Sequence, residues 1–158
     1  MAKILVVYDS ETGHTEKMAF AVAKGAKQVK GAKVEVKRAS ETSVKDLVEA
    51  DGIILGSPTY YGLISARLKK LIDKSVKVHG KLEGKVGAAF TNSGGTASGA
   101  ETTLMSMVQA LLIHGMIIQG RANSKHYGAA AVGAPNKEDL KSCMDLGRRT
   151  ASLVMKLK

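Results

Sequence analysis

Short apolar runs of strand length alternate along this chain with longer stretches that have the spacing of amphipathic helices. The opening residues show the pattern. Ile4-Leu5-Val6-Val7 is a continuous apolar run, and Met18, Val22 and Ala26 then recur at helical spacing. Continuous apolar strands are buried on both faces, which is typical of a parallel sheet covered by helices. The alternation therefore predicts an α/β fold with a doubly wound sheet and right-handed crossovers.

The pattern predicts five strands and five helices. Strands are expected at Lys3–Tyr8, Lys33–Lys37, Gly52–Gly56, Lys85–Thr91 and Met116–Gln119. Helices are expected at Thr15–Val29, Ser43–Glu49, Ser65–Lys74, Glu101–Ile113 and Lys137–Met155. Ligands of such sheets bind at the carboxyl ends of the strands, close to the point where the strand order reverses. The loops that follow the first, third and fourth strands are therefore expected to converge.

The loop after the first strand has the composition of a phosphate cradle. Its hydroxyl groups can donate to phosphate oxygens, and Gly13 lets an irregular backbone approach a ligand closely. The first N–H groups of the following helix lack partners and carry the positive end of the helix dipole. Neither G-x-x-x-x-G-K-[ST] nor G-x-G-x-x-G occurs in the chain. The alternative is an ordinary turn whose hydroxyls only cap the helix. The predicted cradle consists of Ser10, Glu11, Thr12, Gly13, His14 and Thr15.

Two later loops have residues that suit a flat polar ring. The third strand leads into Gly56-Ser57-Pro58-Thr59-Tyr60-Tyr61-Gly62, where two adjacent tyrosines offer stacking surface. The fourth leads into Thr91-Asn92-Ser93-Gly94-Gly95-Thr96-Ala97-Ser98-Gly99, whose glycines and small polar residues suit backbone amides around a heterocycle. Judged singly, the tyrosines could belong to the core and the glycine-rich segment could be a flexible surface loop.

These motifs occur in an order that resembles a known family. The pattern S-x-T-G-x-T-E, which begins at Ser10, resembles the phosphate loop of flavodoxins. The whole chain is similar to a shortened member of the WrbA-type flavodoxin-like NAD(P)H:quinone oxidoreductases. The resemblance is carried by Met1–Tyr8, Ser10 with Gly13-His14, Val36–Arg38, Gly56–Thr59, Glu101–Thr103, His114–Met116 and Tyr127–Ala129.

The resemblance implies a flavodoxin-like fold, a five-stranded parallel sheet of order 2-1-3-4-5 with helices on both faces, and non-covalently bound FMN. The phosphate would be held by the segment from Ser10 to Thr15. The isoalloxazine ring would lie between the Ser57–Gly62 and Thr91–Gly95 loops. In that family the histidine before Gly-Met also approaches the flavin, which nominates His114. The flavin would carry the chemistry, so neither a catalytic side chain nor a metal site is expected.

Two departures from the longer quinone reductases bear on the activity. The segments after Glu41 and between Gln119 and Tyr127 are short, where the longer relatives carry insertions that help to build a tetramer and the active-site walls. Thr12 stands where those enzymes usually place a tyrosine beside the nicotinamide, and it matches classical flavodoxins better.

Three functions remain open from the sequence. The first is an FMN-binding redox protein of the flavodoxin family that carries electrons between protein partners. The alternative is an FMN-dependent NAD(P)H:quinone oxidoreductase, with NAD(P)H as a substrate and a homodimer or homotetramer as its assembly. A module that has lost its cofactor is the third, and the complete phosphate loop argues against it.

Composition limits the partners and the compartment. With 158 residues and 44% hydrophobic content, the chain is expected to form one domain over residues 1–158. No run resembles a signal peptide or a membrane span, so a cytoplasmic protein without membrane insertion is expected. The net charge of +10 is attributed to lysines on solvated helical faces, an acidic protein partner being the next interpretation. Nucleic acid is not expected, since the tyrosines fall at the presumed flavin edge.

The single cysteine has a spacing that suggests a different enzyme. Cys143 and Arg149 match the C-x5-R pattern of cysteine phosphatases. Those enzymes need the thiolate in a loop at a helix N-terminus. Here Asn136 has the character of an N-cap, which places Cys143 inside a helix and predicts a buried structural thiol.

Overall fold

Strand β1 (Ala2–Tyr8) lies inside the sheet, between two other strands, because its side chains are apolar on both faces. In the computed structural model, which describes residues 1–158, the run from Ile4 to Val7 is fully buried. β1 pairs in parallel with β2 (Ala32–Arg38) on one side and with β3 (Gly52–Pro58) on the other. β4 (Val86–Ser93) lies beyond β3, also in parallel. The observed order, β2-β1-β3-β4-β5, confirms the predicted doubly wound topology.

The fifth position of the sheet differs from the prediction of one strand at Met116–Gln119. Two short segments share it: β5 (Ile117–Ile118) pairs with the start of β4, and β6 (Ala129–Val132) pairs with its end. The loop of residues 119–128 separates them. A β-carbon on Gly128 would overlap the Ala89 carbonyl, so only glycine lets the chain return to the sheet there. The run of alanines in β6 has low strand propensity, which explains why the sequence pattern missed it.

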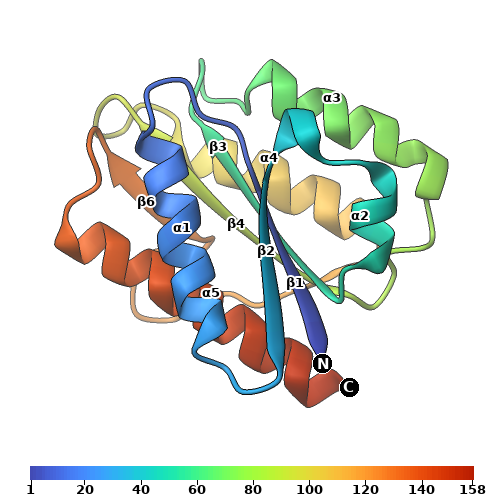
Figure 1. Cartoon of the computed structure of the whole chain (residues 1–158). Helices are drawn as coiled ribbons and strands as arrows, with labels where there is room; N and C mark the ends of the chain where they lie inside the picture. Colours follow the sequence, from blue (N-terminus) through green and yellow to red (C-terminus); the bar gives the residue numbers. More distant parts are fainter.

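Helices cover both faces of the sheet (Figure 1). The helices are α1 (His14–Lys27), α2 (Val44–Glu49), α3 (Ala66–Lys74), α4 (Ala100–Ile113) and α5 (Lys137–Leu157). Short 3-10 turns, η1 (Ala39–Glu41) and η2 (Ser75–Val78), follow β2 and α3. One apolar core joins α1 and α5 to the sheet, and a second joins α2, α3 and α4 to the opposite face. The predicted helices are all present, with ends shifted by a few residues.

Cys143 lies inside α5, as its sequence context predicted. Its thiol is fully buried, and this burial raises its pKa to about 12. A thiol held neutral at physiological pH is a poor nucleophile, so Cys143 serves packing.

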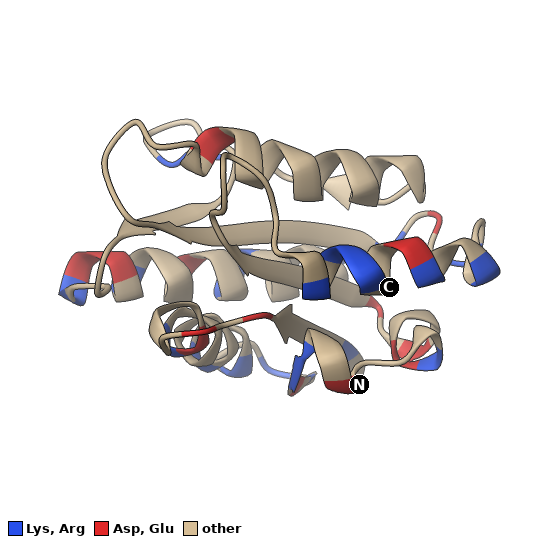
Figure 2. Ribbon diagram, turned by 90° about the horizontal axis from the view of Figure 1, so that it is seen from above, with Lys and Arg blue, Asp and Glu red and all other residues tan.

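The surface lysines are distributed over several elements. Lys24, Lys27, Lys69, Lys70 and Lys74 are exposed, as expected for solvated helical faces. Figure 2 shows Lys and Arg on helices on both sides of the sheet, with Asp and Glu interspersed among them. None of the helices is both long enough and apolar enough to cross a membrane.

Two glycines allow α1 and α5 to pack closely. A β-carbon on Gly25 of α1 would overlap the Met144 carbonyl of α5. A β-carbon on Gly147 of α5 would likewise overlap the Val22 carbonyl of α1. Any larger residue at either position would push the two helices apart. Because these helices form one face of the core, its packing would be disturbed.

We expect Gly147→Ala to lower the free energy of unfolding by at least about 2 kcal/mol, because its methyl group must displace a helix backbone. Urea denaturation measures the change. Gly120→Ala is the control, since the nearest atom to its new β-carbon is the His126 carbonyl oxygen at 3.6 Å. The control should stay within about 0.5 kcal/mol of the wild type. Equal stability of the two variants would contradict the packing argument.

Candidate functional site

The loops after β1, β3 and β4 meet at the carboxyl edge of the sheet, as predicted (Figure 1). Backbone hydrogen bonds join the first residue of two of these loops to the neighbouring strand. The Asp9 N–H donates to the Gly56 carbonyl at 3.1 Å, and the Thr59 N–H donates to the Asn92 carbonyl at 2.7 Å. The loops are therefore parts of one surface, and their relative positions follow from the strand register.

The loop after β1 ends in an open helix N-terminus. Gly13, the N-cap of α1, has a left-handed backbone with φ +93°, and nothing lies within 4 Å of the site of a β-carbon. The first α1 amide with a helical partner is that of Lys17, which donates to the Gly13 carbonyl at 3.0 Å. The amides of residues 14–16 have no such partner, and no side chain caps them.

Hydroxyl groups surround this open terminus. Ser10 Oγ accepts the Gly13 N–H at 3.1 Å, which leaves its own proton free to donate. The Thr12 and Thr15 hydroxyls bond to no other group of the protein, although Thr15 is buried. Free amides and hydroxyls beside a helix N-terminus are a donor set for an anion, so these residues fit a phosphate group. The arrangement argues against a simple capping turn, because no hydroxyl caps the helix.

An ion-pair clamp that the sequence analysis did not single out holds the same loop. Arg67 of α3 donates from Nε to Asp9 Oδ1 at 2.7 Å, and its Nη2 binds the Glu11 carboxylate. The Asp9 side chain is only 6% exposed, and its second oxygen has no partner. The hydrogen bonds that Arg67 donates to Asp9 and Glu11 raise its pKa above the ordinary value. Because the partners are 58 residues apart, only the fold brings them together.

The clamp has an electrostatic consequence for the anion site. Asp9 and Glu11 flank the hydroxyl groups of the loop, and two free carboxylates would repel a phosphate. Arg67 pairs with both of them. The guanidinium thereby offsets their charge without itself being part of the cradle.

The loop after β3 presents its tyrosines to solvent. Tyr60 and Leu63 exchange two backbone hydrogen bonds of 2.9 Å, which closes a tight turn. Inside the turn, Tyr61 has φ +52° and a wholly exposed side chain. The Gly62 carbonyl accepts a hydrogen bond from Thr102 Oγ1 of α4 at 2.7 Å, which anchors the turn. Both aromatic rings lie outside the core, Tyr60 being 43% exposed.

The base of the loop after β4 is firmly held. Thr91 Oγ1 donates to the Ser57 carbonyl at 2.7 Å, so the 2.9 Å contact with Thr59 Oγ1 must use the Thr59 proton. Asn92 Nδ2 donates to the Gly133 carbonyl at 2.6 Å. Ser93 Oγ donates to the Gly95 carbonyl at 3.0 Å, which folds the loop back. These bonds hold the end of β4 and the start of the loop in place.

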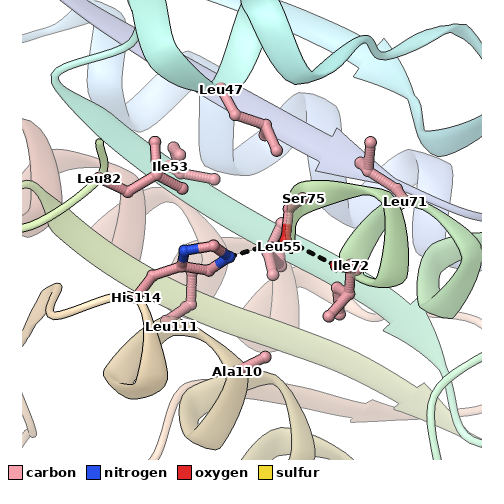
Figure 3. A pocket seen from close by; sticks show the side chains of 10 residues that line it. All are labelled: Leu47, Ile53, Leu55, Leu71, Ile72, Ser75, Leu82, Ala110, Leu111 and His114. Atoms are coloured by element: carbon pink, nitrogen blue, oxygen red, sulfur yellow. Dashed lines mark hydrogen bonds between the residues drawn. The ribbon is translucent and has the colours of Figure 1, made fainter. Parts of the chain in front are cut away.

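His114, which the family resemblance nominated, does not lie at this edge of the sheet in the single chain, and its approach to a flavin stays a prediction. It is the C-cap of α4, and the neighbouring Gly115 packs against Glu83, just before β4 begins. Figure 3 shows its ring among Ile53, Leu82 and Leu111. α4 runs antiparallel to the strands, so a residue at its end must lie at the amino edge of the sheet.

The hydrogen bonds of His114 indicate a structural role. Ser75 Oγ donates to the Ile72 carbonyl at 2.6 Å and therefore accepts from His114 Nε2 at 2.7 Å (Figure 3). The other ring nitrogen, Nδ1, is buried without a partner. Burial lowers the pKa of His114, and nearby His79 adds to the effect.

Comparison with known proteins gives consistent results. Residues 35–128 match the model of the NADPH-dependent FMN reductase family. A flavodoxin of Aquifex aeolicus is 39% identical over 98% of this chain and 88% of its own. An NAD(P)H dehydrogenase (quinone) of Archaeoglobus fulgidus is 39% identical over 99% of this chain and 100% of its own. The crystal structure of a WrbA-like flavodoxin from Agrobacterium tumefaciens superposes with a TM-score of 0.85 at 32% identity, and the match covers both chains completely.

We expect Arg67→Gln to lower the urea midpoint of unfolding measurably, because the buried Asp9 carboxylate loses its charged partner. Adding Asp9→Asn should restore part of this loss, since a neutral amide needs no counter-charge. Chemical denaturation of the two variants measures both effects.

Lys69→Gln is the matched control for this experiment. Its partner, Asp73, is 64% exposed, so Lys69→Gln should change the free energy of unfolding by less than about 0.5 kcal/mol. If Arg67→Gln were as mild as this control, the clamp would have no structural importance.

Proposed function

The chain belongs to the flavodoxin-like NADPH-dependent FMN reductase family, and from this membership we propose that it is an FMN protein that carries electrons between protein partners. One structural observation supports the proposal most directly. The N-terminus of α1 is uncapped and faces free hydroxyl groups, at the edge where three loops meet. That donor set suits the phosphate of a mononucleotide, and no basic side chain is needed.

Ser10, Thr12 and Thr15 would hold the phosphate together with the first amides of α1. These donors are held in place before binding, because Ser10 already bonds to the Gly13 amide and Arg67 holds Asp9 and Glu11. A site organised in advance loses little conformational entropy when the ligand binds.

The two other loops would flank the flavin ring. Tyr60 and Tyr61 offer exposed aromatic faces, and the segment from Thr91 to Gly95 offers backbone groups at a rigid base. Bound FMN supplies the redox chemistry, since it accepts and releases one or two electrons. The protein positions the ring and controls the access of water and partners to it. Because both tyrosines are exposed, a partner could approach the ring without any opening of the fold.

The alternative function is that of an FMN-dependent NAD(P)H:quinone oxidoreductase. The family description and the quinone dehydrogenase of Archaeoglobus fulgidus favour it. The structure offers one supporting feature, an exposed turn at Tyr60 and Tyr61 where a nicotinamide and then a quinone could stack. Thr12 is also exposed at this edge, so a flat substrate would meet a small side chain there.

We expect Ser10→Ala combined with Thr12→Val to weaken FMN binding by at least about tenfold, because each hydroxyl donates to a charged group. Fluorescence titration of FMN measures the dissociation constant. Ser106→Ala is the control, since its hydroxyl bonds within α4 to the Thr102 carbonyl. Undiminished affinity in the double variant would refute the assignment of these hydroxyls.

Anaerobic stopped-flow absorbance separates the two functions. FMN-loaded protein is mixed with NADH or NADPH and then with benzoquinone, and a second sample is titrated with dithionite. For the electron carrier we expect no rapid bleaching by either nicotinamide, and stepwise reduction by dithionite. Rapid bleaching followed by reoxidation with quinone would instead establish the oxidoreductase.

A further inference from the structure

A second group of basic side chains lies apart from the three loops, between α5 and the loop of residues 119–128. It surrounds a hollow of about 50 Å³, which we call the basic hollow. Gly128, in its wall, packs against the Ala89 carbonyl in the middle of β4, so the hollow lies below the carboxyl edge of the sheet. Its polar lining consists of Arg121, Ser124, Lys125, Ser142 and Arg149.

The side chains of this hollow are held in place. The Arg121 N–H donates to the His126 carbonyl at 3.2 Å, and His126 Nδ1 contacts the Arg121 carbonyl at 2.7 Å, which closes the loop. Lys125 has a left-handed backbone with φ +50°. Its ammonium group donates to the Ala130 carbonyl at 2.9 Å and to Asp139 Oδ1 at 3.2 Å. The loop is therefore ordered around the hollow, and its cations do not extend freely into solvent.

The carboxylates nearby do not balance these cations. Asp145 is shared by three guanidinium groups, those of Arg121, Arg148 and Arg149. Asp139 pairs with Lys125. Four cations thus share two carboxylates, and two positive charges remain in excess.

The excess positive charge affects Arg149, the least exposed cation of the hollow. The Arg149 side chain is only 21% exposed. Its burial and the neighbouring Arg148 lower the pKa of Arg149, although Asp145 binds it. Its positive charge is therefore incompletely compensated, and an additional anion would stabilise it.

We propose that the basic hollow is a second phosphate site, which binds a phosphate dianion, either free or at the end of a monoester. A phosphate monoester carries about −1.5 to −2 charges at neutral pH, opposite in sign to the local excess. Guanidinium groups bind phosphate oxygens in pairs, and the Ser124 and Ser142 hydroxyls, which bond to no protein group, can donate to the remaining oxygens. Free phosphate and the 2′-phosphate of NADPH share this chemistry. Cys143 does not line the hollow, so the site binds phosphate without a nucleophile.

NMR titration of ¹⁵N-labelled, FMN-loaded protein tests the proposal, because FMN then occupies the cradle at α1. Inorganic phosphate, 5′-AMP and 2′,5′-ADP are added in separate titrations. We expect saturable shifts of the Ser124 and Ser142 amide signals. Equal affinity for inorganic phosphate and 2′,5′-ADP would assign the site to free phosphate. Tighter binding of 2′,5′-ADP than of 5′-AMP would assign it to a 2′-phosphate.

Substitutions in the lining test whether phosphate binds in the basic hollow itself. Arg149→Gln should weaken phosphate binding at least about tenfold, and Arg121→Gln should do the same. Because Arg121 lies in a surface loop, its variant keeps the test valid if Arg149→Gln does not fold. Arg148→Gln is the matched control: it removes the same charge from the same carboxylate, but Arg148 does not line the hollow. The control should keep the affinity within about threefold.

Three results would overturn the proposal. The first is the absence of saturable shifts at phosphate concentrations up to about 10 mM. The second is equal weakening by Arg148→Gln and Arg149→Gln, which would indicate a general positive field. The third is loss of binding in Ser10→Ala with Thr12→Val, which would place the phosphate in the α1 cradle. Because the last variant tests the FMN assignment separately, failure of one proposal can be distinguished from failure of the other.

Discussion

The burial of β1 between β2 and β3 is the constraint on which the rest of the structure depends. A strand that is apolar on both faces must lie in the interior, and parallel pairing then brings the carboxyl ends of its neighbours to one edge. Tyr8 pairs with Gly56, and Gly56 pairs with Phe90. A β-carbon on Gly56 would overlap the Phe90 ring, so glycine is needed where these strands end. The three loops of the candidate site therefore begin at the same level.

The site combines groups that attract an anion with groups that would repel one. Partial positive charge comes from amides of α1, whereas Asp9 and Glu11 carry full negative charges beside them. Arg67 offsets those charges from another helix. The basic hollow shows the opposite arrangement, in which guanidinium groups outnumber the carboxylate they share. The molecule thus has two places suited to phosphate, one built mainly from backbone dipoles and one from charged side chains.

The predictions from sequence succeeded where the signal was local. The helix starts at Ser43 and Asn136 were correct, because each has a capping box with the aspartate three residues later. The prediction failed for β6, because its alanines pack as a strand only where β4 offers an unpaired edge. The resemblance that nominated His114 did not predict its place at the C-terminal end of α4, because short motifs do not say at which end of a helix a residue lies relative to the sheet.

The sequence by itself determined the alternation of strands and helices, the convergence of the three loops and the hydroxyl groups of the cradle. Each of these follows from hydrophobic periodicity or from residues that are neighbours in the chain. Only the tertiary structure decided that Arg67 neutralises Asp9, that His114 lies at the opposite edge, and that Arg121 reaches Asp145 of α5. Those contacts join residues far apart in the chain, and their energy depends on distance and burial that arise only when the helices pack on the sheet.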